Sequence, residues 1–260
     1  MSEIELKQQF LDENDISELE SSSKNYPKNL RIARKNLPNI FHLGDMFDYS
    51  NAVSVVGTRS CSDFGKEFAE NLGQILSDNK FKVISGLARG IDTAAHTGCV
   101  KNEGIGIAIL PWFHKLYPPE NKFLLDTIIE RGGCAISENL FQPKTNPRFQ
   151  FLNRDELMVA LSIAIVVVES KSKGGAKYTS DYAKRKGVPV IIVKTKTTEQ
   201  ELIEGFETFK NNGAIVAEDE SEVIKILNEL KTKNTVKPKN NIPSVKKKKN
   251  KTTNMSLDKF

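Results

Sequence analysis

Short apolar runs alternate with stretches of helical periodicity through most of this chain, and that alternation decides what it can fold into. Six apolar runs are predicted as strands: residues 52–56, 82–85, 104–110, 134–137, 163–169 and 189–193. Helices are predicted after the second strand and at residues 64–76, 123–130, 154–161, 179–186 and 221–230, with one further strand at 214–216. Wholly apolar strands joined by helices are typical of a parallel sheet that is covered on both faces. We therefore predict an α/β fold, a doubly wound, Rossmann-like and mostly parallel sheet with helices on both faces.

The two ends of the chain differ from this regular middle. Residues 1–23 are acidic and polar, and we predict a weak helix or a flexible leader there. Residues 24–45 contain two prolines, which favours an extended arm that packs on the core. Residues 46–230 are expected to form the Rossmann-like domain. Residues 231–260 hold ten lysines, one acid and few large apolar residues, so we predict a lysine-rich disordered tail.

The charge of the chain is divided between the body and this tail. The net charge is +5, but residues 1–230 carry 28 Lys and Arg against 32 Asp and Glu. Because the body is mildly acidic, any affinity of the body for nucleic acid must come from a local basic patch. The lysines of the tail either add salt-sensitive affinity for DNA or form a solvated charge run without a specific partner.

Several classes of protein are disfavoured by what the sequence does not contain. No apolar run approaches the roughly 18 residues of a membrane helix, and the N-terminus has no basic-then-apolar signal pattern. The three cysteines, Cys61, Cys99 and Cys134, are widely spaced, which favours small buried thiols over a disulfide frame or a zinc site. We therefore expect a cytoplasmic protein that contacts no membrane and holds no metal.

Three glycine-containing turns follow predicted strands and open predicted helices, at residues 57–59, 85–92 and 174–179. In a parallel sheet such turns lie along one edge, at the carboxyl ends of the strands, where ligands bind near the switch in strand order. Helix N-termini present unpaired N–H groups there, and Arg59 and Arg89 add guanidinium groups that suit phosphate. Together the three turns predict an anion-binding pocket.

The two common nucleotide-binding fingerprints are missing from these turns. The sequence has neither GxxxxGK[ST] nor a GxGxxG after its first strand, so it predicts neither a Walker-type ATP site nor an ordinary dinucleotide site. We interpret Asp92 as the cap of the helix that it opens and His96 as a packing residue. Glu138 and Glu169 are expected to cap or brace turns. We predict no catalytic residue and no cofactor.

The motifs at these turns resemble those of the DNA-processing protein DprA family, also called Smf. The family's G[ST]R turn stands here at residues 57–59, and its SGLARGID octet with the following histidine stands at 85–92 and His96. Its YP..N, SE, F..RNR..A.LS and VVE....SGS..TA motifs are matched at Tyr117, Pro118, Asn121, Ser137, Glu138, Phe151, Arg154, Leu161, Ser162, Val168, Glu169, Gly175 and Thr179. The match runs from Tyr26 to Leu230, and we expect the Rossmann-like core alone, without the winged-helix domain that many relatives carry.

The resemblance implies an extended Rossmann-like domain that forms a homodimer and binds single-stranded DNA without metal or nucleotide. Family members protect single-stranded DNA and load the RecA-type recombinase onto it in natural transformation and recombination. The DNA-binding and phosphate-binding residues carried over to this chain are Gly57, Thr58, Arg59, Ser85, Gly86, Arg89, Gly90, Arg154, Gly174, Gly175, Lys177 and Thr179. Trp112 and Phe113 are candidates for stacking on bases, or for ordinary packing in the core or a dimer interface.

Two motifs depart from the family pattern. The RNR triplet is Arg-Asp-Glu here, at residues 154–156, and the SGS triplet is Gly-Gly-Ala at 174–176, with Lys177 restoring a positive charge close by. The acidic triplet leaves open a diverged pocket that senses a nucleotide or a nucleotide-derived signal. A third alternative is a ribohydrolase of the lysine-decarboxylase-like group, which shares this fold. The glutamate of that group's PGGxGTxxE motif is replaced here by Tyr182, so we predict a protein that is not an enzyme.

Overall fold

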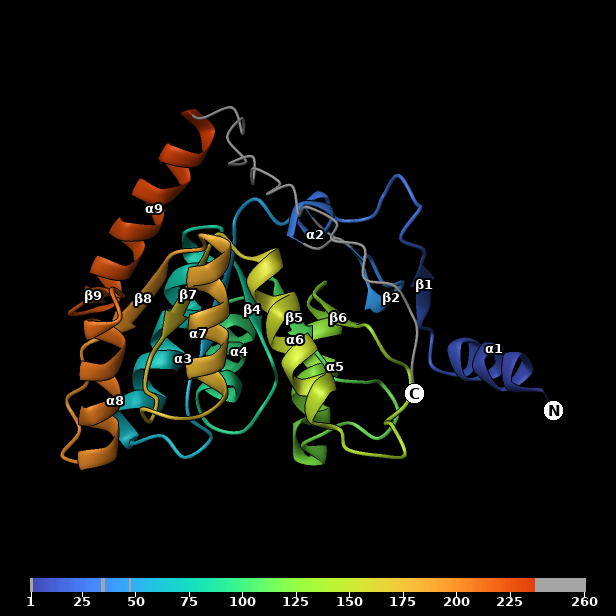
Figure 1. The fold of residues 1–260 in the computed structure, drawn as a ribbon, viewed down its shortest axis with the longest axis horizontal. Helices are drawn as coiled ribbons and strands as arrows, with labels where there is room; N and C mark the ends of the chain where they lie inside the picture. Colours follow the sequence, from blue (N-terminus) through green and yellow to red (C-terminus); the bar gives the residue numbers. More distant parts are fainter. Residues whose placement is uncertain (1, 34–35, 47, 237–260) are drawn as a thin grey trace, which may run out of the picture.

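The structure, a computed structural model, describes residues 2–33, 36–46 and 48–236 (Figure 1). The strands in these residues are β1 Ser17–Leu19, β2 Ile40–Gly44, β3 Ala52–Val56, β4 Lys82–Ser85, β5 Gly106–Ile109, β6 Cys134–Ser137, β7 Ala164–Val167, β8 Val190–Val193 and β9 Ile215–Ala217. The helices are α1 Glu3–Glu13, α2 Lys28–Ala33, α3 Asp63–Asp78, α4 Ile91–Lys101, α5 Lys122–Glu130, α6 Arg148–Leu161, α7 Gly175–Lys186, α8 Gln200–Asn211 and α9 Glu220–Val236, with a 3-10 turn η1 at Pro119–Asn121.

These strands form one sheet, in the order β1-β2-β6-β5-β4-β3-β7-β8-β9. The pairs from β6 across to β9 are parallel, whereas β2 pairs with β6, and β1 with β2, in the antiparallel sense. The chain moves outward from β3 through β4, β5 and β6, returns to the other side of β3 as β7, and then moves outward to β9. The strand order therefore reverses between β3 and β7, and the predicted doubly wound, mostly parallel sheet is confirmed.

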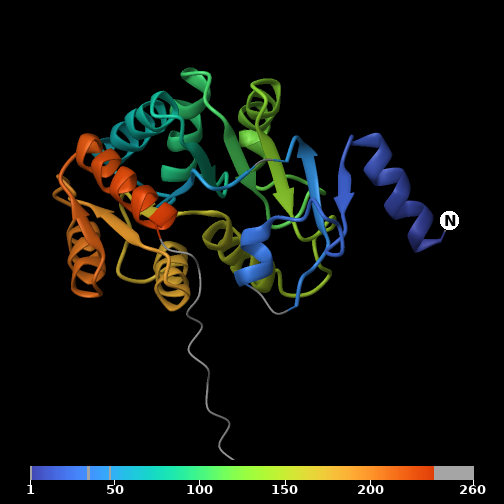
Figure 2. The ribbon, with the colours of Figure 1, turned by 90° about the horizontal axis from the view of Figure 1, so that it is seen from above.

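Helices cover both faces of the sheet, as the alternation predicts (Figure 2). One face carries α3, α4, α5 and α9, and the other carries α2, α6, α7 and α8. Within β3, Val53 and Val55 pack into the core beneath α3 and α4, while Ala52 and Val56 pack into the core beneath α6 and α7. Because side chains are buried on both faces, the strands of the sheet centre are almost wholly apolar in sequence, and the exception, Ser54 of β3, is hydrogen-bonded to Ser162.

The N-terminal segment is more regular than the sequence predicts. The expected leader contains α1, which begins with a capping box in which Ser2 and Glu5 exchange hydrogen bonds, and then β1. The expected arm contains α2 and β2, and Tyr26 and Leu30 of this arm are buried in the core. Pairing of β1 with β2 and of β2 with β6 makes both segments part of the sheet itself. A strand of three residues is too short to show a period of two in the sequence, and this explains why β1 was missed.

Four helices also differ from the sequence-based prediction. The helix α7 begins at Gly175, before the predicted start at residue 179. The helix α6 begins at Arg148, before the predicted start at residue 154. No helix is predicted where α8 lies, although its buried Leu202 and Phe209 fall on one face. The helix α9 continues to Val236, past residue 231 where the tail is predicted to begin. The rest of that predicted tail, residues 237–260, lies outside the described residues.

The cysteines are free thiols, as predicted. Cys99 and Cys134 are buried, and burial raises the pKa of these thiols to about 11 and about 12. Cys61 is half-buried, with a pKa raised chiefly by burial. In the described part of the chain, no three His, Cys, Asp or Glu side chains are grouped so as to hold a metal ion, and no helix is both long and apolar enough to cross a membrane.

Candidate nucleic-acid interface

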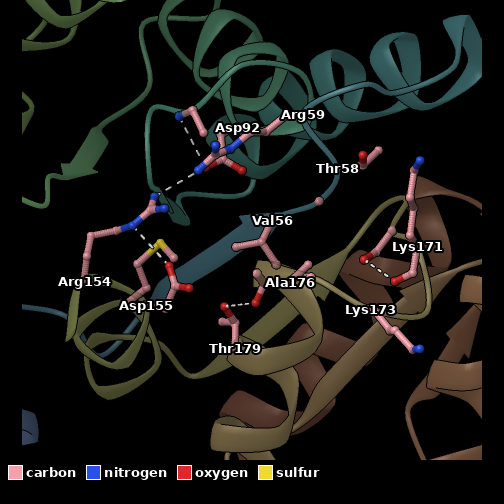
Figure 3. A pocket seen from close by; sticks show the side chains of 16 residues that line it. Val56, Thr58, Arg59, Asp92, Arg154, Asp155, Lys171, Lys173, Ala176 and Thr179 are labelled. Atoms are coloured by element: carbon pink, nitrogen blue, oxygen red, sulfur yellow. Dashed lines mark hydrogen bonds and ion pairs between the residues drawn. The ribbon is translucent and has the colours of Figure 1, made fainter. Parts of the chain in front are cut away.

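Two adjoining cavities lie at the carboxyl ends of the central strands, where the strand order reverses. The smaller, which we call the inner pocket, has a volume of about 410 Å³ and is lined by Val56, Gly57, Thr58, Arg59, Ala88, Asp92, Arg154, Asp155, Met158, Ser170, Lys171, Lys173, Gly174, Gly175, Ala176 and Thr179 (Figure 3). The larger, the outer groove, has about 910 Å³ and is lined by Arg59, Trp112, Lys115, Leu116, Tyr117, Pro119, Gln142, Asn146, Pro147, Arg148, Phe151, Leu152, Arg154, Asp155, Gly174, Gly175 and Tyr178. The two cavities share walls, so they form one continuous depression.

The 57–59 turn is held against the sheet and presents one exposed cation. The N–H of Thr58 donates to the carbonyl of Glu169 (2.7 Å), and the carbonyl of Thr58 accepts from the N–H of Ile91 (3.3 Å). The carboxylate of Glu169 in turn accepts from the N–H and hydroxyl of Ser62, which confirms the predicted bracing role of Glu169. Arg59 is exposed at the junction of the two cavities.

The 85–92 turn is closed by its own hydrogen bonds. The hydroxyl of Ser85 donates to the carbonyl of Val55 (2.6 Å), and one carboxylate oxygen of Asp92 accepts from the N–H groups of Gly86 and Ala88 (3.1 and 3.4 Å). The prediction that Asp92 caps its helix is wrong, because α4 has Gly90 at its N-cap position and no side chain caps it. Asp92 instead binds the loop that precedes the helix.

A buried cation lies between two buried carboxylates at the floor of the inner pocket. Arg154 reaches Asp92 (Nη1 to Oδ2, 3.7 Å) and Asp155 (Nε to Oδ1, 3.1 Å), and each of the three side chains is only 8% exposed (Figure 3). Burial raises the pKa of Asp92 to about 6 and also raises the pKa of Asp155, with Arg154 opposing both shifts. Neither Nε nor Nη1 of Arg154 donates a hydrogen bond of good geometry to another described residue.

Gly86 is required by the position of this arginine. A Cβ atom on Gly86 would lie 1.2 Å from Nη1 of Arg154 and 2.9 Å from Oδ2 of Asp92, so any larger residue would displace the buried guanidinium. The buried Arg154 therefore joins the 85–92 turn to α6 and does not project freely into the cavity.

The 174–179 turn is open. A Cβ atom built on Gly174 would meet nothing within 4 Å, and one on Gly175 would meet only Oδ2 of Asp155, at 3.9 Å. No side chain caps α7, so its first N–H groups have no partner inside the helix. Lys171 and Lys173 stand on the loop before this turn, with Lys171 paired to Glu201. A helix N-terminus with cations beside it is suited to an anion.

Aromatic rings line the outer groove beside Arg59 and two further cations. The ring of Phe151 packs edge-to-face against Trp112 (5.4 Å between centroids) and Tyr117 (6.1 Å). Trp112 is buried and donates from Nε1 to the carbonyl of Lys115, so its packing role is confirmed, while Tyr117 is 45% exposed. Phe113 is half-buried and packs against the small cluster that includes Leu11 of the N-terminal helix. The groove also holds Arg59, Lys115 and Arg148.

The structure brings together seven of the twelve predicted binding residues in the inner pocket: Gly57, Thr58, Arg59, Arg154, Gly174, Gly175 and Thr179. The other five line neither cavity: Ser85, Gly86, Arg89, Gly90 and Lys177. Ser85, Gly86 and Gly90 belong to the 85–92 turn, which we call the closed turn because its own hydrogen bonds close it. Arg89 is exposed and pairs with Glu120, and Lys177 pairs with Asp181 one helical turn on.

Sequence reasoning missed part of the outer groove. Arg148 lies on the helix α6 and Lys115 on an irregular loop, and neither belongs to a matched motif. Tyr117 and Phe151 do belong to matched motifs but are not among the predicted binding residues. The two lysines at 171 and 173 had a visible signal, since they flank the glycine pair on its strand side. His96 is fully buried, as predicted for a packing residue, and burial lowers its pKa to about 4.

Residues 18–228 match the family described as DNA recombination-mediator protein A. The chain belongs to this family. Among curated relatives, Protein Smf of Synechocystis sp. is 30% identical over 226 residues, which cover 83% of this chain and 56% of that protein. The chain thus spans about half the length of the curated relatives it matches.

Two solved structures of the family resemble this fold. DNA processing protein A (DprA) of Streptococcus pneumoniae has a TM-score of 0.74 at 27% identity, covering 86% of this chain and 78% of that chain. DprA of Helicobacter pylori, whose structure concerns the single-stranded DNA binding mode of that protein, has a TM-score of 0.69 at 23% identity, covering 82% of this chain and 96% of that chain. Both support the Rossmann-like arrangement described above.

Proposed function

We propose that this protein binds single-stranded DNA along the inner pocket and the outer groove and catalyses no reaction on it. The observation that carries the proposal is the continuity of the two cavities, because an anion site opens directly into a groove lined by aromatic rings. A single nucleotide would need only a pocket of the smaller kind. The adjoining volume of about 910 Å³ gives room for the neighbouring nucleotides of a strand.

A backbone phosphate is proposed to bind at the open 174–179 turn. Uncapped N–H groups of α7 point to this position, and Arg59, Lys171 and Lys173 supply positive charge around it. The absence of side-chain atoms at Gly174 and Gly175 lets a phosphate approach the backbone closely. This local patch satisfies the requirement that a mildly acidic body must bind DNA through a restricted basic surface.

Bases are proposed to stack in the outer groove. Tyr117 is the most exposed of the rings described there, and it packs on Phe151, which lies 5.9 Å from the guanidinium carbon of Arg59. Stacking of a base on an aromatic ring contributes roughly 1–3 kcal/mol and tolerates any base. The groove is therefore suited to binding without sequence preference.

The two carboxylates of the inner pocket favour a binding role over a catalytic one. Asp92 accepts two backbone hydrogen bonds and Asp155 pairs with Arg154, so both are held by the protein itself. Tyr182, which stands where the ribohydrolase motif has its glutamate, is buried in the core. A general acid or base would need to reach its substrate.

Membership of the family supports three further proposals. We propose that the protein acts in the cytoplasm, assembles as a homodimer, and loads a RecA-type recombinase onto single-stranded DNA during DNA uptake and recombination. Sedimentation of the full chain would test the dimer, and a purely monomeric species at micromolar concentration would contradict it. Nucleation of recombinase filaments on DNA coated with single-strand-binding protein would test loading, and an unchanged lag time with this protein would contradict that proposal.

The binding proposal is tested by titrating a labelled oligothymidine that has a 5′-hydroxyl against the full-length protein and its variants. Arg59→Ala should lower the affinity by about ten-fold, because Arg59 lies at the junction of the two cavities. Arg131→Ala is the matched control, since Arg131 is likewise exposed but pairs with Glu103 and lines neither cavity. The lysine-rich tail is the same in all these proteins, so its contribution cancels.

Equal losses in the two variants would contradict binding at the cavities and would assign the affinity to general charge. Thymidine monophosphate should compete weakly with the oligonucleotide. If it instead competes as well as the whole strand does, the nucleotide-sensing alternative replaces DNA binding. Arg89→Ala tests separately the sequence-based prediction that Arg89 binds DNA. Only a loss of affinity as large as that of Arg59→Ala would support that prediction.

A further inference from the structure

The floor of the inner pocket carries more negative than positive charge. Arg154 is the one cation among the three buried side chains described there, and Asp92 and Asp155 are both acids. When both carboxylates are ionised, the group has a net charge of one negative. The exposed cations of the pocket, among them Arg59 and Lys173, stand at its mouth. The pocket therefore attracts an anion at the mouth and opposes additional negative charge at the floor.

Asp155 is the acid that faces the proposed phosphate position. Its Oδ2 lies 3.9 Å from the point where a Cβ atom of Gly175 would be, so the carboxylate stands beside the uncapped N-terminus of α7. A phosphate on the same turn lies within a few ångströms of this carboxylate. Asp92 is farther inside the closed turn, where its Oδ2 is occupied by two N–H groups.

The charge of a phosphate depends on its chemical class. A phosphodiester inside a strand carries one negative charge, whereas a phosphomonoester carries about 1.5 to 2 at neutral pH. The cations at the mouth favour both classes. A nearby buried carboxylate penalises the second charge, and the penalty is larger in a desolvated pocket than in water.

We propose that Asp155 is a specificity-determining residue that makes the inner pocket select the phosphodiester of a DNA strand over phosphomonoesters such as mononucleotides and 5′-phosphorylated ends. The inference rests on the proposed function, because it concerns which phosphate the same pocket accepts. It gives the acid at residue 155 a role in binding, namely to exclude free nucleotides that would otherwise compete with DNA.

The selection should weaken as the pH falls. Asp155 is faced by Arg59 from the 57–59 turn, Asp92 from α4, Arg154 and Glu156 from α6, Thr179 from α7, and Lys171 and Lys173 from the loop before α7. Of the two acids at the floor, Asp92 has a pKa of about 6 and the pKa of Asp155 is raised by burial. Protonation of either removes the net negative charge of the floor. Arginine and lysine stay charged in this range, so the mouth does not change.

The test compares Asp155→Asn with the unaltered full-length protein, using 5′-hydroxyl oligothymidine and thymidine monophosphate as probes. The amide is nearly isosteric with the carboxylate and removes one negative charge. The affinity for the monophosphate should rise about ten-fold more than the affinity for the oligonucleotide. Glu156→Gln is the matched control: it removes the same charge from the next residue, which lines neither cavity, and its amide oxygen can still accept the hydrogen bond from Tyr178.

A second measurement uses simple anions as probes. Sulfate and methyl sulfate keep two and one negative charges across the mildly acid range, so their relative affinities report the pocket and not the ligand. In the unaltered protein their affinity ratio should shift toward sulfate as the pH falls and the buried acids of the floor take up protons. In Asp155→Asn the ratio should favour sulfate more already at neutral pH, and a ratio equal to that of the unaltered protein would overturn the inference.

The outcomes separate this inference from the proposed function. If the unaltered protein binds the oligonucleotide but Asp155→Asn changes both affinities equally, or Glu156→Gln shifts their ratio as much, then Asp155 is not the selective residue and DNA binding stands. If no oligonucleotide binds but the monophosphate binds to Asp155→Asn and not to the unaltered protein, the proposed function fails and the role of Asp155 stands.

Discussion

The 85–92 turn and the 174–179 turn both contribute to the wall of the inner pocket, but they use their backbone groups in different ways. In the 85–92 turn, the N–H groups of Gly86 and Ala88 donate to Asp92, and the turn packs on Arg154 and on the 57–59 turn. In the 174–179 turn, the helix begins without a side-chain cap, and Gly174 has no neighbour within 4 Å of its Cβ position.

This difference separates the motif that is easiest to recognise from the one that is best placed to bind. In the octet at residues 85–92, Ser85, Gly86, Gly90 and Asp92 are each constrained by close packing or by a hydrogen bond. The glycine pair at 174–175 is less distinctive, yet it leaves donors exposed to a ligand. A motif that is easy to recognise in the sequence can therefore consist of residues that pack against one another. Whether its residues contact a ligand has to be established from the structure.

Replacing Arg154, the buried cation that packs on the closed turn, should cause the largest loss of stability. Arg154→Met leaves Asp92 and Asp155 buried without their common partner, which is expected to lower the free energy of unfolding by about 3–5 kcal/mol at mildly alkaline pH. The loss should shrink at acid pH, where the two carboxylates are neutral. Urea denaturation at both pH values measures this. Arg131→Met, at an exposed pair, should cost less than about 1 kcal/mol, and equal losses in the two variants would show that Arg154 has no special role.

Filling the closed turn should have the next largest effect. Gly90 has φ +76°, and a Cβ atom there would lie 2.3 Å from the carbonyl oxygen of Thr58. Gly90→Ala should therefore cost on the order of 3 kcal/mol, because the two turns must separate. Gly187→Ala is the reference for a positive φ in open space and should cost about 1 kcal/mol. Gly187 has ψ +19° whereas Gly90 has ψ −124°, so the difference between the variants combines the close contact with the less favourable backbone of Gly90. Thermal unfolding compares them, and matching losses would mean that the close approach of the turns contributes nothing.

The sheet centre could be predicted from the sequence because its strands are buried on both faces. Residues 82–85 and 134–137 appear in the structure as β4 and β6 with the predicted bounds, since a continuous apolar run between turns has few other folds. The edges could not be predicted in the same way. β1 has three residues of which none is fully buried, and β2 lies between β1 and β6, a pairing that its own sequence does not reveal.

The part of the candidate site formed by backbone turns could be predicted from the sequence. Gly57, Gly174 and Gly175 follow strands, and parallel strands bring such turns together. Side-chain partners decide the rest. Arg89 pairs with Glu120, and Arg154 pairs with Asp92 as well as with its neighbour Asp155. Glu120 and Asp92 are far from their partners in the sequence, so spacing does not reveal these two pairs.

The closed turn and the helix α4 that follows it contain two titratable groups that should control stability with pH. His96 has a folded pKa of about 4 against an ordinary 6.5, so the folded state loses stability as the pH falls between these values. Asp92 has a folded pKa of about 6 against 3.8, so its contribution runs the other way and stability rises as the pH falls through the same range.

Asp92→Asn should therefore unmask the effect of His96. Between about pH 6 and pH 4, the variant should lose on the order of 2 kcal/mol more of its unfolding free energy than the unaltered protein does. Chemical denaturation across this range gives the two slopes. Parallel slopes would show that Asp92 does not hold a proton in the folded state.

At the open turn, residues 174–179, a substitution should weaken DNA binding and leave the stability of the protein nearly unchanged. Gly175 does not need a positive φ, and an added methyl group would meet only Oδ2 of Asp155 at an ordinary contact distance of 3.9 Å. Gly175→Ala should therefore change the free energy of unfolding by less than about 0.5 kcal/mol. The methyl group would nevertheless stand where the proposed phosphate approaches the N–H groups of α7, so the affinity for 5′-hydroxyl oligothymidine should fall several-fold.

The control for this variant is Ser221→Ala, an exposed residue in the first turn of α9 that lines neither cavity. It should leave both the stability and the affinity for DNA unchanged. Full affinity in a folded Gly175→Ala protein would mean that the open turn is not in contact with DNA, and the contrast between the two turns would then describe packing alone. A loss of affinity without a loss of stability, set against the opposite result for Gly90→Ala, would separate the turn that binds from the turn that supports it.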